Sequence, residues 1–139
     1  MIEMNQIKTG MTYTLQKRVT ESDTSLNYGS GKIENLLATP RLVALMIEAS
    51  SLLIDPLLPE GFVSVGRHVE VDHFKATCLG ATVTVEVRVD YAQSGKVLIS
   101  MNAYDEHGKI GEGKHSRMVV NYKKLLEKAT ERDMDTKKD

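Results

Sequence analysis

Residues 40–53, PRLVALMIEASSLL, decide the fold of this 139-residue chain. From Leu42 to Ala49 every side chain except that of Glu48 is apolar, so two helical turns carry almost no polar face. A helix that is apolar all round must be covered by other elements when the protein is water-soluble. The stretch therefore predicts one long buried helix of fourteen residues, about 21 Å in length.

The rest of the chain predicts strands that can cover this helix. Regular alternation of apolar and polar residues is typical of a strand with one buried face. The clearest run is residues 81–92, in which four valines and a tyrosine alternate with polar and charged residues. The predicted strands are residues 11–19, 64–74, 81–92, 97–104 and 109–122.

The connections indicate how these strands are arranged. Residues 93–96 (QSGK) and 105–108 (DEHG) are short hairpin turns, which force antiparallel neighbours. Residues 21–31 are rich in Ser, Thr, Asp, Asn and Gly and predict a loop. We therefore expect one strand, the buried helix, and then a four-strand meander around it. This is an α+β hotdog fold, with an antiparallel sheet of about five strands wrapped around the helix.

Length and composition predict a single hotdog domain over residues 1–125, followed by a charged C-terminal tail over residues 126–139. Eleven of the last seventeen residues are charged. We expect this end of the chain to form a short solvated helix that frays into disorder.

Composition also excludes several classes of function. Eighteen Lys and Arg residues against 19 Asp and Glu residues give a net charge of −1, which leaves no global basic field for nucleic acid or an anionic membrane. No apolar run approaches the ~20 residues of a membrane-spanning helix, and residues 1–6 do not resemble a secretory signal. Cys78 has no disulfide partner, and no Cys/His cluster has zinc-ligand spacing. We expect a cytoplasmic protein with no metal and no cofactor.

Residues 36–46, LLATPRLVALM, resemble the helix-start motif of the fluoroacetyl-CoA thioesterase-like family of hotdog proteins. Further pieces match in order: GSG at 29–31, VDH at 71–73 with Thr77 and Gly80 after it, and GKHSR at 113–117. The resemblance covers roughly residues 10–125. It implies a hotdog fold, assembly at least as dimers with sites between protomers, and action on acyl-CoA thioesters without metal or organic cofactor.

The resemblance also implies particular site residues. Hydrolases of the family use a threonine, a histidine and a glutamate, and the first two correspond to Thr39 and His73. The glutamate corresponds to Ile47, which cannot transfer a proton. Glu48 is the neighbouring candidate, but nine residues turn it about 180° around the helix from Thr39. Ile47 is only about 80° away, so Glu48 should point to the opposite side.

The sequence around Thr39 has a chemical and a structural interpretation. Thr39 followed by Pro40 predicts a helix start, with Thr39 as N-cap and Pro40 as the first helical residue. The free N–H groups of a buried helix N-terminus can stabilise an oxyanion, and the Thr39 hydroxyl can attack or position a water. The alternative is that Thr39 only caps its helix.

The other candidate residues also have alternatives. His73 shares a strand face with Val69 and Val71, so it should face the helix as a general base or as a core histidine. Glu48 is either a base or a solvated residue. Pro40, Lys75, His115 and Arg117 are candidate substrate-binding residues. His115 and Arg117 fall on one face of the last strand, where arginine suits the phosphates of CoA; the alternative for the cations is a surface position.

We therefore predict an acyl-CoA thioesterase that hydrolyses a small acyl-CoA to a carboxylate and CoA. The alternative is a non-hydrolytic acyl-CoA-binding hotdog module that has lost the carboxylate at Ile47. Hotdog hydratase chemistry needs a spaced Asp and His, which the adjacent pair Asp72-His73 does not supply. A homodimer, or a tetramer of two dimers, is expected because the edge of strand 81–92 would otherwise stay unpaired.

Overall fold

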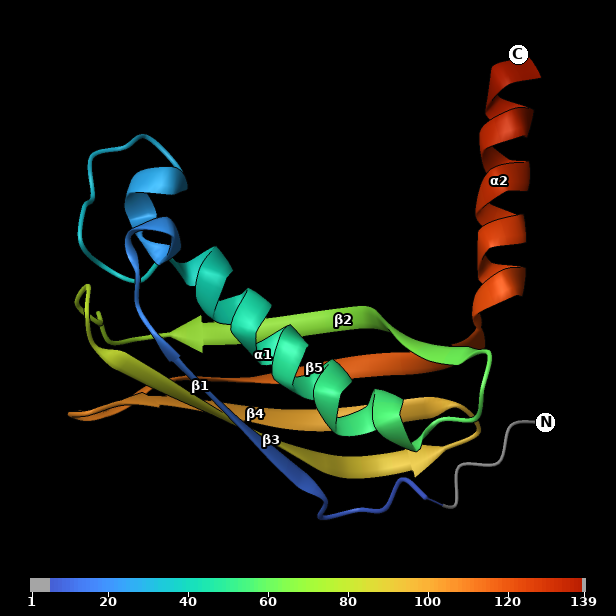
Figure 1. The fold of residues 1–139 in the computed structure, drawn as a ribbon, viewed down its shortest axis with the longest axis horizontal. Coiled ribbons are helices and arrows are strands. Elements are labelled where there is room, and N and C mark those ends of the chain that lie inside the picture. Colours follow the sequence, from blue (N-terminus) through green and yellow to red (C-terminus); the bar gives the residue numbers. More distant parts are fainter. Residues whose placement is uncertain (1–5, 139) are drawn as a thin grey trace.

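One antiparallel sheet of five strands and a helix that lies across it make up the fold (Figure 1). The computed structural model describes residues 6–138. The strands are β1 (Thr12–Arg18), β2 (Phe62–His73), β3 (Thr82–Gln93), β4 (Lys96–Asp105) and β5 (Gly108–Asn121), and the two α-helices are α1 (Thr39–Ile54) and α2 (Tyr122–Lys138). The predicted α+β hotdog fold is confirmed.

The segment between β1 and α1 is more structured than predicted. Two short 3-10 helices, η1 (Glu21–Asp23) and η2 (Ser25–Asn27), occupy most of the expected loop. A third, η3 (Asp55–Leu57), follows α1 directly. The buried Asp23 of η1 becomes important for the site described below.

The strand order is β1-β3-β4-β5-β2, which corrects the predicted four-strand meander. β3, β4 and β5 do follow one another through hairpins, and the first turn holds Ser94 and Gly95 at φ 54° and 86°, as a two-residue hairpin favours. β2, however, pairs with β5 and not with β3. β3 has no edge left for β2, because β1 and β4 occupy both of its edges.

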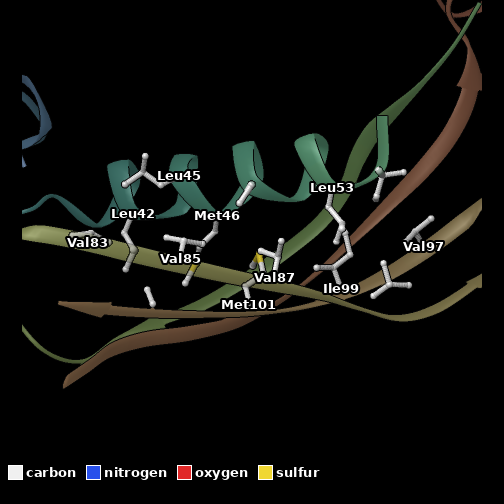
Figure 2. Close-up of a cluster of buried hydrophobic side chains, with 14 of the residues drawn as sticks. Leu42, Leu45, Met46, Leu53, Val83, Val85, Val87, Val97, Ile99 and Met101 are labelled. Carbon is white, nitrogen blue, oxygen red and sulfur yellow. The ribbon is translucent and has the colours of Figure 1, made fainter. Parts of the chain in front are cut away.

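The core lies between one side of α1 and the inner face of β3 and β4 (Figure 2). Every second residue of these strands points inward, as the alternating pattern predicts. The residues buried there to 2% exposure or less include Leu42, Met46, Ala49, Val83, Val85, Val87, Ile99 and Met101. Burial of each large apolar side chain contributes roughly 1.5–3 kcal/mol, so this layer fixes α1 on the sheet.

The other side of α1 is only partly covered, contrary to the expectation that the helix is wrapped all round. Val43, Ala44 and Ile47 are only half-buried, and Leu52 is 40% exposed. The single sheet of this chain covers one side of the helix, so an apolar side is left over. A second chain is one way to cover it.

The edge strands of the sheet are β1 and β2, which corrects the expectation that strand 81–92 leaves an edge unpaired. β3 is interior, whereas β2 pairs only with β5 among the described strands. Residues 66–70 of β2 are all exposed. Within residues 6–138, no helix has the length and apolar character needed to cross a membrane.

α2 follows β5 without a loop and extends away from the sheet (Figure 1). A solvated helix was predicted here, and the helix spans Tyr122–Lys138; the predicted fraying of the chain end stays a prediction. The predicted domain boundary between residues 125 and 126 falls inside this helix. Leu125 is half-buried near the sheet, while Leu126 and Met134 are about half-exposed.

Removal of the chain after Thr130 is therefore expected to leave folding and activity nearly unchanged. Residues 131–135 of the deleted part are all exposed, so its loss should cost less than about 0.5 kcal/mol of unfolding free energy. Thermal unfolding of the truncated and full chains measures this. A fall of many degrees in Tm would contradict the prediction.

Candidate active site

Thr39 is the first residue of α1 and not its N-cap, as had been predicted. Ala38 is the N-cap: its backbone is extended, and its carbonyl accepts the Leu42 N–H at 3.0 Å. Pro40 is accordingly the second helical residue. The Ala38 N–H in turn donates to the Asp23 carbonyl at 2.9 Å, which fixes where the chain turns into the helix. The Thr39 hydroxyl makes no capping bond and is free for another partner.

That partner is His73. A hydrogen bond of 2.7 Å joins Thr39 Oγ1 to His73 Nδ1. His73 is the last residue of β2, and its half-buried side chain shares a face with Val71, as period-two counting predicted. The start of α1 and the end of β2 thus meet as a hydroxyl and an imidazole.

The surroundings of His73 favour a neutral ring. Burial lowers the pKa of His73 below its usual value, and the neighbouring Lys75 backbone offsets part of this. The other ring nitrogen, Nε2, is buried and has no hydrogen-bond partner among the described residues. A neutral imidazole carries one proton, so Nδ1 can accept the Thr39 proton when Nε2 holds that proton. The pair therefore has the geometry of a hydroxyl and its base.

The N-terminus of α1 offers a donor next to this pair. Pro40 has no N–H, and the N–H groups of Arg41 and Leu42 are both directed to the Ala38 carbonyl. The backbone hydrogen bonds of the described residues leave the Thr39 N–H without an acceptor. This N–H lies at the positive end of the helix, where it can stabilise developing negative charge.

The segment that leads into α1 is held from two sides. The Leu37 N–H donates to the Thr77 carbonyl at 2.9 Å, and the Ser25 N–H donates to the Leu36 carbonyl at 2.9 Å. Thr77 is itself buried, and its hydroxyl donates to Asp105 at 2.9 Å. Thr77 follows β2 closely in the chain, so these bonds fix the start of α1 relative to the end of β2.

Glu48 does not join the Thr39–His73 pair in the chain. Its side chain is exposed on the third turn of α1. Ile47 lies on the same side of the helix as Thr39 and is half-buried, but eight residues separate the two by about 12 Å along the axis. The geometry thus agrees with the predicted orientation of both residues.

Two of the candidate substrate-binding residues lie next to the pair. Pro40 is exposed on the first turn of α1, directly after Thr39. Lys75 is exposed two residues beyond His73, where its N–H donates to the Ile110 carbonyl at 3.2 Å. Both can contact a molecule bound at Thr39.

His115 and Arg117 lie elsewhere and are buried, at 3% and 6% exposure. Arg117 donates from Nε to the Ser64 hydroxyl at 2.8 Å and from Nη2 to the Ser64 carbonyl at 2.7 Å. Its Nη1 is 3.2 Å from His115 Nε2, and the Ser64 hydroxyl donates to Asp55 at 2.6 Å. The alternative that His115 and Arg117 are surface cations is therefore wrong.

This arrangement determines the state of both side chains. Burial lowers the pKa of Arg117, while the charge of Asp55 raises it. Burial also lowers the pKa of His115, and the positive charge of Arg117 lowers it further. An arginine stays protonated in proteins, so His115 Nε2 accepts from Arg117 and the other nitrogen donates to the His68 carbonyl at 2.7 Å. The result is a buried cation that no carboxylate of residues 6–138 contacts directly.

The sequence analysis missed Asp23, Ser64 and Asp55. Asp23 belongs to the predicted loop at residues 21–31. The polar composition of this loop does not indicate that one of its acidic side chains is buried. Ser64 and Asp55 lie outside every motif. Cys78 is exposed and forms no disulfide. Over the described part of the chain, no group of three His, Cys, Asp or Glu side chains is arranged to hold a metal ion.

The chain combines a hotdog fold with a threonine–histidine pair at the helix N-terminus, and comparison with known proteins gives its class, the thioesterases. The family model described as fluoroacetyl-CoA-specific thioesterase matches residues 19–123. The fluoroacetyl-CoA thioesterase of Streptantibioticus cattleyicolor is 31% identical over 97 residues, which are 70% of each chain. The chain therefore belongs to the fluoroacetyl-CoA-specific thioesterase family, and the predicted resemblance is confirmed.

Solved structures support the same assignment. A hot-dog-like protein from Thermanaerovibrio acidaminovorans is 34% identical, with a TM-score of 0.87 over 92% of this chain and 94% of its own. A threonine-to-serine variant of the fluoroacetyl-CoA thioesterase, in complex with acetyl-CoA, is 25% identical, with a TM-score of 0.85 over 91% and 98%.

Proposed function

We propose that the chain hydrolyses a small acyl-CoA thioester with Thr39 and His73 as its working pair. The observation that carries this is the 2.7 Å hydrogen bond between Thr39 Oγ1 and His73 Nδ1 at the N-terminus of α1. Membership of a thioesterase family confirms the predicted class of enzyme, a thioester hydrolase. The proposal adds the residues that act.

In the proposed reaction, neutral His73 takes a proton at Nδ1 from the Thr39 hydroxyl or from a water that this hydroxyl holds. The oxygen attacks the thioester carbonyl, and the Thr39 N–H at the helix N-terminus stabilises the oxyanion. The carbon–sulfur bond then breaks, and the imidazolium returns the proton to the thiolate of CoA. If Thr39 itself attacks, a water hydrolyses the acyl ester in a second step, so the products are the carboxylate and CoA in both cases.

The experiment that tests this function measures release of free thiol from a panel of acyl-CoAs of increasing acyl length, alongside binding of the same panel. We expect thiol release to be fastest with a short acyl group. Binding without thiol release for every member would overturn the proposal in favour of the non-hydrolytic binding module, which the loss of a carboxylate at Ile47 motivates. The relatives named above are thioesterases and give that alternative no support.

We also propose that the chain forms a homodimer through the exposed edge of β2. A long unpaired edge strand is a site for association, and Val69 on β2 is 37% exposed on the side that faces α1. The partly covered apolar side of α1, with Val43 and Ile47, lies on the same side of the sheet. A two-fold axis at this edge would pair the two β2 strands antiparallel.

Such a dimer would give Arg117 and His115 a place in the site. Within one protomer, Arg117 pairs with Gly66, seven residues or about 23 Å along β2 from His73. Antiparallel pairing reverses the partner strand, so its Gly66 end would lie beside the His73 end of the first. The buried cation of Arg117 would then face the Thr39–His73 pair of the other protomer and could bind an anionic part of the substrate.

We expect sedimentation to give a mass of about twice 15.5 kDa at micromolar concentration, and Val69→Lys to shift it toward the monomer. Leu98→Lys is the matched control, because Leu98 is also 37% exposed but lies on the outer face of β4. If the unaltered chain is a tetramer and Leu98→Lys reduces it to a dimer, a second interface uses the outer face of the sheet. A 15.5 kDa species for the unaltered chain would contradict the prediction.

We place the protein in the cytoplasm. The free, exposed thiol of Cys78 supports this, since reduced exposed cysteines are typical of reducing compartments.

A further inference from the structure

Asp23 is the most completely buried carboxylate among the described residues, at 1% exposure, and it lies against the start of α1. Its Oδ2 accepts from Lys17 Nζ at 2.5 Å, and its Oδ1 accepts from Arg41 Nε at 2.7 Å. The Thr20 N–H and hydroxyl donate to Oδ2 at 2.8 and 3.0 Å. Four donors from three residues thus surround one carboxylate.

These donors keep the carboxylate ionised. Burial alone would raise the pKa of Asp23, but the hydrogen bonds from Lys17, Thr20 and Arg41 outweigh it and hold the pKa well below its usual range. A buried charge that is paired and hydrogen-bonded in this way is costly to disturb, because removal of one partner leaves the others uncompensated.

The same residue holds the start of α1 at two points. The Asp23 carbonyl accepts the N–H of Ala38, the N-cap residue, at 2.9 Å. The Asp23 carboxylate holds Arg41, two residues beyond Thr39, through Nε. Thr39 therefore lies between two contacts made by one residue. No side chain caps the N-terminus of α1. The contacts of Asp23 with Ala38 and Arg41 therefore determine where the helix begins.

We propose that Asp23 is a positioning residue for the Thr39–His73 pair: by holding Ala38 and Arg41 it sets the place of the Thr39 hydroxyl against His73 Nδ1. This inference rests on the proposed function. Its physical basis is that a catalytic hydroxyl displaced by about 1 Å can lose up to roughly 10² in rate. Asp23 itself need not touch the substrate.

The test compares Asp23→Asn with Asp90→Asn. Asp90 also lies near two cations, with Arg88 and Lys114 each 3.4 Å away, but it is on the outer face of β3. In Asp23→Asn the charge is lost and an amide donor faces other donors. We expect kcat to fall about tenfold with little change in KM, whereas Asp90→Asn should keep both values.

Two further measurements separate positioning from a loss of folding. In the NMR spectrum of the His73 ring nitrogens, Asp23→Asn should lose the signature of the Thr39 hydrogen bond at Nδ1, and Asp90→Asn should keep it. In the double variant Asp23→Asn, Thr39→Ala, kcat should equal that of Thr39→Ala alone, because Asp23 acts through Thr39. An unchanged Nδ1 signal together with unchanged kcat in a folded Asp23→Asn variant would overturn the proposal.

The outcomes also distinguish failure of the inference from failure of the proposed function. If Thr39→Ala alone leaves kcat unchanged, the proposed chemistry is wrong, while the NMR signal still reports whether Asp23 sets the hydrogen bond. If Asp23→Asn does not fold, Arg41→Lys provides the second variant: it keeps the charge but has no Nε donor at the same place. We expect it to weaken the Nδ1 signal and lower kcat, and a wild-type result in both would overturn the proposal.

Discussion

Thr39→Ala and His73→Ala are each expected to lower the rate of thioester hydrolysis by about 10² or more, and the double variant should be little worse than either single one. The reason is the 2.7 Å hydrogen bond that makes the two side chains one unit. Loss of the hydroxyl leaves the base nothing to act on, and loss of the base leaves the hydroxyl inactive. Single-turnover kinetics on the best acyl-CoA of the panel measures this.

Thr39→Ser is the matched control, since it keeps the hydroxyl and should keep much of the activity. Thr39→Ala removes no helix cap, because Ala38 is the N-cap, but it removes the hydrogen bond to His73, so we expect it to cost about 0.5–1.5 kcal/mol of unfolding free energy. Fully additive effects of the two alanine substitutions would show that Thr39 and His73 do not act as a unit.

The pH dependence gives an independent check on His73. A general base acts in its neutral form, so kcat/KM should rise with pH as His73 loses its proton and then level off. Because burial lowers the pKa of His73, the midpoint should lie below the ordinary value of about 6.5. A midpoint above that value, or a rate that falls as pH rises from 5 to 8, would contradict the role of His73 as base.

The fold could be predicted because its two decisive patterns are local. The apolar run at residues 40–53 predicts a buried helix, and the period-two alternation at residues 81–92 predicts a half-buried strand. The position of β2 could not be predicted, because alternation shows that a strand has two faces but not which neighbour it pairs with. That choice depends on β1 occupying the edge of β3, a contact between residues about 70 positions apart.

In the candidate site, too, the features that depend on local patterns could be predicted and those that depend on tertiary contacts could not. The face of His73 follows from strand geometry, and the structure agrees with it. The exact start of α1 does not follow from Thr39-Pro40, because the Ala38–Asp23 hydrogen bond sets it. The burial of Arg117 likewise depends on Ser64, which belongs to the strand paired with its own. Tertiary contacts of this kind leave no periodic signal in the sequence.

Ile47→Glu is expected to raise the hydrolysis rate by about 10², a typical effect of a well-placed acid or base. The motivation is the family glutamate that the resemblance assigns to this position. Residue 47 lies on the Thr39 side of α1, about 12 Å along the axis. A carboxylate there cannot touch the Thr39 hydroxyl, so it would act on a water or substrate bound between them or in the partner's site.

The Ile47→Glu substitution should also lower the stability of the fold, which opposes the gain in rate. An unpaired carboxylate buried in an apolar place costs several kcal/mol or becomes protonated, but Ile47 is only half-buried, so water reaches part of the site and the cost should be smaller. Ile47→Gln is the matched control, with the same size and no base: it should carry much of the stability loss and none of the rate gain. A folded Ile47→Glu variant with the turnover of Ile47→Gln would show that the missing carboxylate does not limit the rate. The Thr39–His73 pair would then have to account for hydrolysis without it.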